Sequence, residues 1–294
     1  MQLLNMQSCI ADEGFQFLPY PGSLGLVFGR YFYAQLLCTP GEKYYYSNPA
    51  FMLAAYFIEK FSGISLERYV TDHIVKPVRP SGAATYFDKF NGKFLFDPSR
   101  VGEYYKYIDL ENRRKVLQFG VCSSEFDLGS ASGAGGIVSS QADIADLYFT
   151  LFNFSAGFTG APLFRQRQTL FNLVRPRTLV NKWSPGENVY YAQGLFVVAP
   201  TTRRSEYDTT PTLIFYEGEI ICSHTANIFR VATNSTPAMM AQVWSAVRVA
   251  YATGAQLHAA EQSRDESFPS LWSKLITPPK TLTDMAFELM EYFS

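Results

Sequence analysis

The sequence predicts an α+β fold, in which helices and strands occupy separate stretches of the chain. Apolar residues recur at helical spacing near residues 50 and 145, in each case directly after a residue that can cap a helix. Residues 190–231 are instead rich in β-branched and aromatic side chains, which favour strands. The chain has 294 residues and 47% hydrophobic content, which suits one large domain or two closely packed ones.

The first predicted helix follows a turn at Pro40-Gly41. Asn48 is placed to cap this helix, because its side-chain oxygen can accept an orphan backbone N–H of the first turn. Pro49 suits the first helical position, where no N–H is needed, and Gly63 is expected to end the helix. The apolar stripe of this helix consists of Phe51, Leu53, Ala54, Phe57, Ile58 and Phe61.

Further helices are predicted downstream. Residues 65–76 form the second, with Ser65 as its cap and Pro77 as its stop. Another begins after Ser140, with Asp143 in the reciprocal capping position. The remaining helical patterns cover residues 162–175, 238–251 and 282–293.

Strand-forming residues gather in three runs, at 190–198, 212–216 and 220–231. Glu217-Gly218 is predicted to form a hairpin-like break between the last two runs. Residues 79–135 carry many aromatic residues with weak periodicity, so we expect a loop-rich segment there that packs over the core. Such segments often wall an active-site cleft, but for each single aromatic residue plain structural packing is the favoured interpretation.

Composition restricts the possible partners. The formal net charge is −1 and only 17% of residues are charged, which gives no indication of a nucleic acid or an anionic membrane as a partner. No apolar run reaches the length of a membrane-spanning helix. Neither a metal nor a cofactor is predicted, since the three histidines show no metal-ligand spacing. They are His73, His224 and His258.

The cysteines are scattered and contain no Cys-x-x-Cys motif. We expect free buried thiols, because a domain of this size does not need disulfides to fold. The four positions are Cys9, Cys38, Cys122 and Cys222. The sequence leaves the compartment and the oligomeric state open.

Two stretches together resemble a known family. The first, residues 40–78, contains Pro-Gly, then Tyr46-Ser47-Asn48, a helix that ends in Ser-Gly, and Pro77-Val78. The second, Ser132–Asp143, is a glycine-rich turn before a capped helix; it lacks the Gly-Lys-Ser/Thr of a phosphate loop. Both resemble the serine β-lactamase-like family, which includes class C β-lactamases, DD-peptidases and related esterases. The resemblance implies an antiparallel sheet flanked by helices plus a helical subdomain, and acyl transfer on an amide or ester.

The resemblance also implies site residues. Tyr46 would act as general base or proton relay, and Asn48 would hold the substrate amide or a lysine. Tyr216-Glu217-Gly218 falls where the family has Lys-Thr-Gly or His-x-Gly. Tyr216 would hydrogen-bond the substrate and Gly218 would let an edge strand approach it. Tyrosine lacks the positive charge of lysine, which weakens the case for a substrate carboxylate. His224 is a rival to Tyr216, although no glycine follows it at the matching spacing.

The nucleophile motif of the family is not found in these residues. The family pairs a serine with a lysine as Ser-x-x-Lys, and no lysine of this sequence has serine three residues before it. Thr277-Pro-Pro-Lys280 comes nearest, but its prolines prevent the required helical turn. Leu3–Ser8 resembles the segment that follows the nucleophile helix. The resemblance therefore implies an N-terminally incomplete domain over residues 1–258 and a C-terminal extension over 259–294.

Two hypotheses account for this pattern. In one, the chain is part of a hydrolase whose Ser-x-x-Lys lies elsewhere, and its substrate is a small molecule or a peptide. In the other, the chain is a pseudoenzyme with a binding or structural role. Both predict no hydrolase activity for these residues alone, because acyl transfer needs an activated nucleophile. We also expect low solubility, from an unpaired sheet edge and bare apolar surface.

Overall fold

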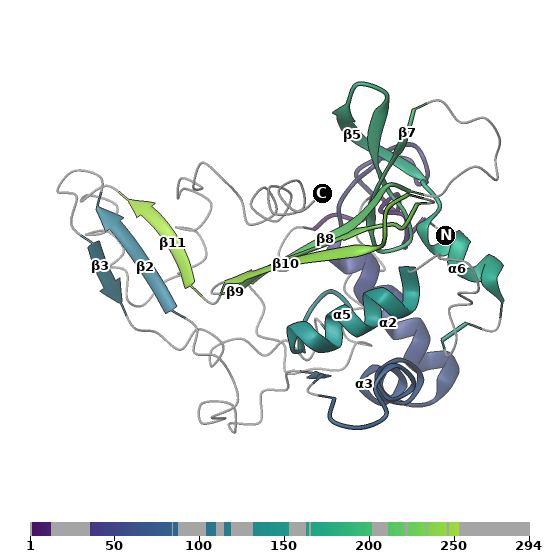
Figure 1. The fold of residues 1–294 in the computed structure, drawn as a ribbon, viewed down its shortest axis with the longest axis horizontal. Coiled ribbons are helices and arrows are strands. Elements are labelled where there is room, and N and C mark those ends of the chain that lie inside the picture. The colour runs from purple at the N-terminus through teal and green to yellow at the C-terminus, as the bar shows by residue number, and fades with distance from the viewer. Residues whose placement is uncertain are drawn as a thin grey trace.

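The computed structural model describes residues 2–12, 36–83, 85–87, 104–109, 115–118, 132–152, 163–164, 166–201, 211–220, 223–233, 235–245 and 247–252. Its largest element is a six-stranded antiparallel sheet in the order β10-β9-β8-β7-β6-β5 (Figure 1). The strands are β5 Thr178–Ser184, β6 Glu187–Tyr191, β7 Phe196–Pro200, β8 Leu213–Ile220, β9 Ser223–Arg230 and β10 Met239–Ser245. The helices flanking this sheet confirm the predicted α+β fold with an antiparallel sheet.

Two smaller sheets accompany the large one. They pair β1 (Tyr86–Phe87) with β4 (Ile137–Val138), and β2 (Tyr104–Asp109) with both β3 (Lys115–Gln118) and β11 (Val247–Ala252). Strands β1, β2 and β3 fall in the segment that we expected to be loop-rich. That expectation is therefore wrong at these three strands, whereas the described residues 79–83, 85 and 132–135 of the same segment lie in neither a helix nor a strand.

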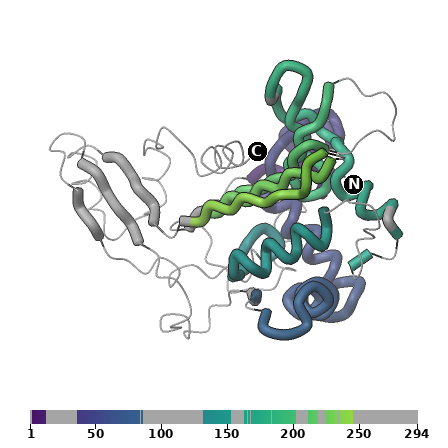
Figure 2. The backbone as a smooth tube through the Cα atoms, in the orientation of Figure 1, coloured from purple at the N-terminus to yellow at the C-terminus, as the bar shows by residue number. Residues whose placement is uncertain are grey.

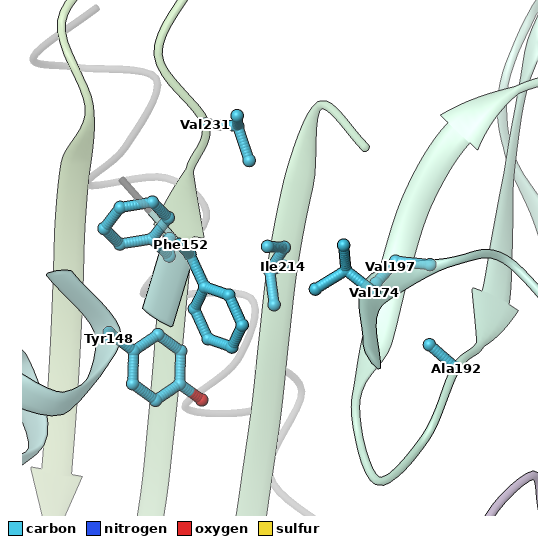
Figure 3. Packing of buried hydrophobic residues seen from close by; sticks show 8 residues of the cluster. Tyr148, Phe152, Val174, Ala192, Val197, Ile214 and Val231 are labelled. Atoms are coloured by element: carbon cyan, nitrogen blue, oxygen red, sulfur yellow. The ribbon is translucent and has the colours of Figure 1, made fainter. Parts of the chain in front are cut away.

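The core covers both faces of the six-stranded sheet. On one face, helices α5 (Gln141–Phe152) and α6 (Arg167–Val174) contribute to a buried cluster (Figure 3). It consists of Tyr148, Phe152, Val174, Ala192, Val197, Ile214, Phe229 and Val231. The opposite face buries Val189, Val198, Phe215, Ala226 and Ile228. Neighbours in a strand alternate between the clusters because successive side chains point to opposite faces. Strands β8, β9 and β10 run side by side, with α5 against them (Figure 2).

Helix α2 (Asn48–Ser62) begins one residue earlier than predicted. Ser47 is its N-cap, since the Ser47 hydroxyl accepts a hydrogen bond from the Ala50 N–H at 3.2 Å. The prediction of Asn48 as the cap is therefore wrong, and Pro49 is the second helical residue. Gly63 ends the helix as predicted, with φ 73° and a bond from its N–H to the Glu59 carbonyl.

The buried face of α2 also differs from the predicted stripe. Small residues let it pack closely on its neighbours, while Phe61 is 85% exposed and Phe57 is 39% exposed. The buried residues of α2 are Pro49, Ala50, Met52, Leu53 and Ala55. Helical spacing alone located the helix but did not select the face that packs.

The second predicted helix is a composite of three parts: α3 (Leu66–Val70), a π-helical turn η2 (Thr71–Val75) and α4 (Lys76–Val78). Ser65 caps it as predicted, by accepting from the Arg68 N–H at 3.3 Å. Pro77 does not stop it, which corrects the prediction. Pro77 is the second residue of α4, which continues directly from the π-helical turn and ends one residue later at Val78.

The strand boundaries also differ from the sequence prediction. The predicted run 190–198 is split by a turn between β6 and β7, and β5 was not predicted. Glu217-Gly218 is not a hairpin break. Both residues lie inside β8, where they pair with Ala226 and Thr225 of β9. Pairing with β9 instead continues through the glycine as far as Ile220, which lies opposite Ser223.

The helix predicted over residues 238–251 does not form. Its alanine, methionine and glutamine residues favour a helix locally, but β10 pairs along its whole length with β9. Cross-strand bonds support this pairing: Gln242 Nε2 and Trp244 Nε1 each donate to Asn227 Oδ1 at 3.0 Å. The open edge of β9 therefore outweighs local propensity.

Ser140 caps α5 as predicted, accepting from the Asp143 N–H at 3.1 Å. The buried carboxylate of Asp143 accepts from Arg79 Nη1 and from the Thr85 hydroxyl, both at 2.7 Å. Asp143 thus joins the start of α5 to residues far away in the sequence, which the prediction did not include.

Gly133 lies against the backbone of α2. A Cβ at this position would come within 2.6 Å of the Phe51 carbonyl oxygen and 2.6 Å of the Ala55 Cβ. The absence of a side chain at Gly133 therefore lets this turn pass close to α2. We expect Gly133→Ala to lower the free energy of unfolding by roughly 1–3 kcal/mol, because a backbone contact cannot rotate away. Urea denaturation followed by tryptophan fluorescence measures this change.

Gly135 provides the matched control, since a Cβ there has no heavy atom within 4 Å. Gly135→Ala should change stability by less than about 0.5 kcal/mol. Equal destabilisation by the two alanines would show that α2 does not pack on Gly133.

The C-terminal extension, 259–294, lies outside the described residues, as does the helix predicted over 282–293. The division at residue 258 and the low solubility expected from an open sheet edge therefore stay predictions.

Candidate functional site

Two of the predicted site residues meet in the fold. Tyr46 lies on the loop before α2, and Tyr216 lies on β8, 170 positions further along the chain. Their hydroxyl oxygens are 3.3 Å apart, so one hydroxyl donates a hydrogen bond to the other. Tyr46 is 39% exposed, which leaves this pair accessible from solvent.

Asn48, the third predicted residue, is held by a residue that the sequence did not indicate. Asp12 accepts from the Asn48 backbone N–H through Oδ1 and from Asn48 Nδ2 through Oδ2, each at 3.1 Å. A carboxylate is favourable beside a helix N-terminus, where N–H groups carry partial positive charge. The preference of a helix N-terminus for a carboxylate could have suggested an acidic partner. It could not have selected Asp12, because the sequence contains many other acidic residues.

The segment that carries Asp12 is fastened beside the Tyr46 loop. Cys9 and Cys38 form a disulfide, with Cα atoms 5.3 Å apart. The Tyr45 N–H donates to the Met6 carbonyl at 2.7 Å, and the Gly41 N–H donates to the Gln7 carbonyl at 2.8 Å. The prediction of free thiols is therefore wrong for this pair, because the fold brings two distant segments side by side. Cys122 and Cys222 lie outside the described residues.

Gly218, the fourth predicted residue, lies two positions beyond Tyr216 on β8 and pairs with Thr225. Strand β8 is not an edge strand over its first part, where it lies between β7 and β9. Its pairing with β7 ends at Phe215, however, so Tyr216 and Gly218 extend past β7. Among the described strands, β8 therefore shows the expected edge only in this second half.

His224, the rival of Tyr216, lies on β9 opposite Glu219. The side chain of His224 lies outside what the structure describes, whereas the Tyr216 hydroxyl lies 3.3 Å from that of Tyr46. The structure thus brings together Tyr46 and Tyr216, and places Asn48 beside Asp12.

The electrostatic environment keeps Tyr46 protonated. Burial raises the pKa of Tyr46 well above its ordinary value, and Tyr216, Asp12 and Glu217 raise it further. All three of these neighbours are acids. Burial, followed by the neighbouring Tyr191, raises the pKa of Tyr216 as well. Near neutral pH, both hydroxyl groups therefore remain neutral and can donate and accept hydrogen bonds.

Burial raises the pKa of Asp12 above 3.8, and the two bonds from Asn48 oppose the rise. The folded state thus keeps this proton to a higher pH than the unfolded state. The stability that protonated Asp12 contributes to the fold is present below pH 3.8. It is lost as the pH rises through the pKa that Asp12 has in the folded state. We expect the unfolding free energy of Asp12→Asn, relative to the unmodified chain, to increase over this range, measured by urea denaturation at a series of pH values.

Asp72 gives the opposite control. Its exposed carboxylate has a lowered pKa, mainly because Lys76 Nζ donates to it. Its stabilising effect is therefore present above pH 3.8 and disappears as pH falls through the lowered value. The unfolding free energy of Asp72→Asn, relative to the unmodified chain, should thus rise as the pH falls. The same pH trend in Asp72→Asn and Asp12→Asn would contradict the raised pKa of Asp12.

Among the described residues, no three histidine, cysteine, aspartate or glutamate side chains are grouped as metal ligands. The helices in the same part of the chain are all too short or too polar to cross a membrane.

Comparison with known proteins identifies the family. A family model described as Beta-lactamase matches residues 1–261. The chain belongs to the β-lactamase family. The resemblance drawn from residues 40–78 and 132–143 is therefore confirmed. No curated protein matches this β-lactamase family member closely enough to count as a relative.

Solved structures share the β-lactamase family fold with this chain. A penicillin binding protein from Bacillus halodurans is 16% identical with a TM-score of 0.58, over 89% of this chain and 71% of that one. The octameric penicillin-binding protein homologue from Pyrococcus abyssi is 18% identical with a TM-score of 0.59, over 83% of this chain and 50% of that one. D-amino acid amidase from Ochrobactrum anthropi SV3 is 16% identical with a TM-score of 0.58, over 99% of this chain and 71% of that one. At these identities, the likeness establishes the fold alone.

Proposed function

We propose that residues 1–294 form a serine-hydrolase-type site that binds an amide or ester group without acyl transfer. The observation that carries this proposal is the hydrogen bond between the Tyr46 and Tyr216 hydroxyls, with acids as the neighbours that act on Tyr46. A tyrosine needs a nearby cation to give up its proton near neutral pH. Here the neighbours have the opposite effect, and the sequence contains no Ser-x-x-Lys.

The same groups are suited to binding. A neutral Tyr46 hydroxyl can donate to a carbonyl oxygen while it accepts from Tyr216. Asn48 donates its side-chain N–H to Asp12, so its carbonyl oxygen is oriented by that bond and can accept an amide N–H. Gly218 lies on the part of β8 that extends past β7, where an extended ligand could lie alongside.

The test combines two measurements on the whole chain. Incubation with a chromogenic cephalosporin and with a p-nitrophenyl ester should give no turnover, and intact-mass spectrometry should show no acyl adduct. Ligand-observed NMR with benzamide should show reversible binding. We expect Tyr46→Phe and Tyr216→Phe each to weaken that binding roughly two- to tenfold, the usual effect of losing one hydrogen bond. Tyr69→Phe is the control, since Tyr69 packs on His73 of the helical segment.

Hydrolysis of an amide or ester is the second candidate, and membership of the β-lactamase family favours it. A covalent adduct that forms with either reagent would establish this candidate and contradict the proposal. Mapping the adduct to a serine would then identify the nucleophile.

A further inference from the structure

The disulfide between Cys9 and Cys38 joins the two segments that meet at Asn48. Asp12 lies three residues after Cys9, and Asn48 lies ten residues after Cys38. Asp12 accepts from the backbone N–H and from Nδ2 of Asn48, each at 3.1 Å. Among the described residues, no other hydrogen bond holds the Asn48 side chain. The orientation of Asn48 therefore depends on Asp12, and on the contacts that keep Asp12 beside it.

The residues before Cys9 are held without the disulfide. The Met6 carbonyl accepts from the Tyr45 N–H at 2.7 Å, and the Gln7 carbonyl accepts from the Gly41 N–H at 2.8 Å. Met6 is 1% exposed, so this part of the chain is also packed into the interior. Reduction of the disulfide is therefore expected to leave Met6, Gln7 and the six-stranded sheet in place.

The residues after Cys9 have weaker support. Their described backbone contacts with the segment that carries the other cysteine are a bond from the Leu37 N–H to the Cys9 carbonyl at 2.9 Å and a single bridge between Ile10 and Leu36. Leu36 and Leu37 are each 46% exposed, so water competes for these contacts. The covalent bond is thus the strongest described link that holds the stretch from Cys9 to Asp12.

A reductant can approach the disulfide from the side of Cys38. Cys38 is half-buried between the exposed residues Leu37 and Thr39, whereas Cys9 is 0% exposed. A thiolate of a dithiol reductant would attack the Cys38 sulfur and release Cys9 as a thiolate, which takes up a proton. The second thiol of the reductant then attacks the mixed disulfide, so the reductant leaves as a cyclic disulfide and both cysteines become thiols.

We infer that the redox state of Cys9 and Cys38 regulates the candidate site by controlling the contact between Asp12 and Asn48. In the disulfide state, Asp12 orients the Asn48 side chain, whose carbonyl oxygen can then accept an amide N–H. In the dithiol state, Asp12 moves away with its segment and the Asn48 side chain is free to rotate. This inference rests on the proposed binding function and adds its regulation by thiol–disulfide exchange.

The test compares the whole chain in its two redox states, below the melting temperature of the reduced form. Dithiothreitol should weaken benzamide binding in ligand-observed NMR roughly two- to tenfold, the effect of losing one oriented hydrogen bond. The side-chain amide signals of Asn48, assigned by their absence in Asn48→Ala, should shift on reduction and return after oxidation by glutathione disulfide. The circular dichroism of the sheet should stay unchanged.

Three variants locate the effect. Cys9→Ser combined with Cys38→Ser should behave like the reduced chain with and without dithiothreitol, which excludes effects of the reductant on the other two cysteines. Asp12→Ala should bind benzamide as weakly as the reduced chain and lose no further affinity on reduction, because the contact that transmits the change is already absent. Glu42→Ala is the matched control: Glu42 is an exposed acid on the Tyr46 loop, and its replacement should leave the response to reduction intact.

The outcomes separate this inference from the proposed function. Unchanged Asn48 amide signals on reduction would overturn the inferred regulation, whether or not benzamide binds. Loss of the circular dichroism of the sheet would also overturn it, because the disulfide would then support the whole fold. A further loss of affinity in reduced Asp12→Ala, equal to that of the unmodified chain, would show that reduction does not act through Asp12. Absence of benzamide binding in both redox states would instead overturn the proposed function, while shifted Asn48 signals would still support the regulation.

Discussion

Arg79→Met is expected to lower the free energy of unfolding by roughly 3 kcal/mol, because it removes the cation from a buried carboxylate. Asp143 is only 6% exposed in its side chain, and Arg79 Nη1 lies 2.7 Å from its Oδ1. Methionine retains much of the apolar length of arginine, so the change reports the lost ion pair. Urea denaturation followed by fluorescence and circular dichroism gives the two-state free energy.

Asp146 provides the control for this pair. It lies 3.3 Å from the same Arg79 nitrogen, but its side chain is 54% exposed. Asp146→Asn should therefore change stability by less than about 1 kcal/mol, as surface ion pairs do. Similar losses from Arg79→Met and Asp146→Asn would show that burial of Asp143 does not determine the effect.

The double replacement of Cys9 and Cys38 by serine should lower the free energy of unfolding by roughly 3–4 kcal/mol, the chain-entropy value for a loop of this length. The two cysteines are 29 positions apart, and their bond limits the unfolded ensemble. Cys9 also has φ 58°, a region that non-glycine residues seldom adopt.

Reduction of the unmodified chain provides the companion measurement. Dithiothreitol should lower its melting temperature, while the double serine variant should melt at the same temperature with and without reductant. A thiol count of the denatured, unreduced chain that includes Cys9 and Cys38 would contradict the disulfide.

Local signals allowed several elements to be predicted from sequence. Ser65, Ser140 and Gly63 each act within a few residues, so their capping roles follow from neighbouring residues alone. The predicted helix over 238–251 failed for the opposite reason. Its residues favour a helix, but residues 239–245 pair with β9 as strand β10, and local sequence does not show such a pairing.

The candidate site also contains features that the sequence predicted and features that it did not. Tyr46 and Tyr216 were associated only through the family resemblance, since no periodicity connects residues 170 positions apart. Asp12 and the Cys9–Cys38 bond were missed because each depends on a segment that folds back beside the Tyr46 loop. Such contacts are set by the tertiary fold, which the order of the residues does not show directly.

Met6 connects the candidate site to oxidative chemistry. The Ser47 N–H, between Tyr46 and Asn48, donates to the Met6 sulfur at 3.2 Å, and Met6 is 1% exposed. Conversion to the sulfoxide would place a larger polar group in this tight position and push the loop away. An oxidant and a reductant would thus disturb the same loop by different routes, one through the thioether of Met6 and the other through the disulfide. Purified material whose Met6 has been oxidised during storage would therefore be altered at the Tyr46 loop while its sheet remained folded.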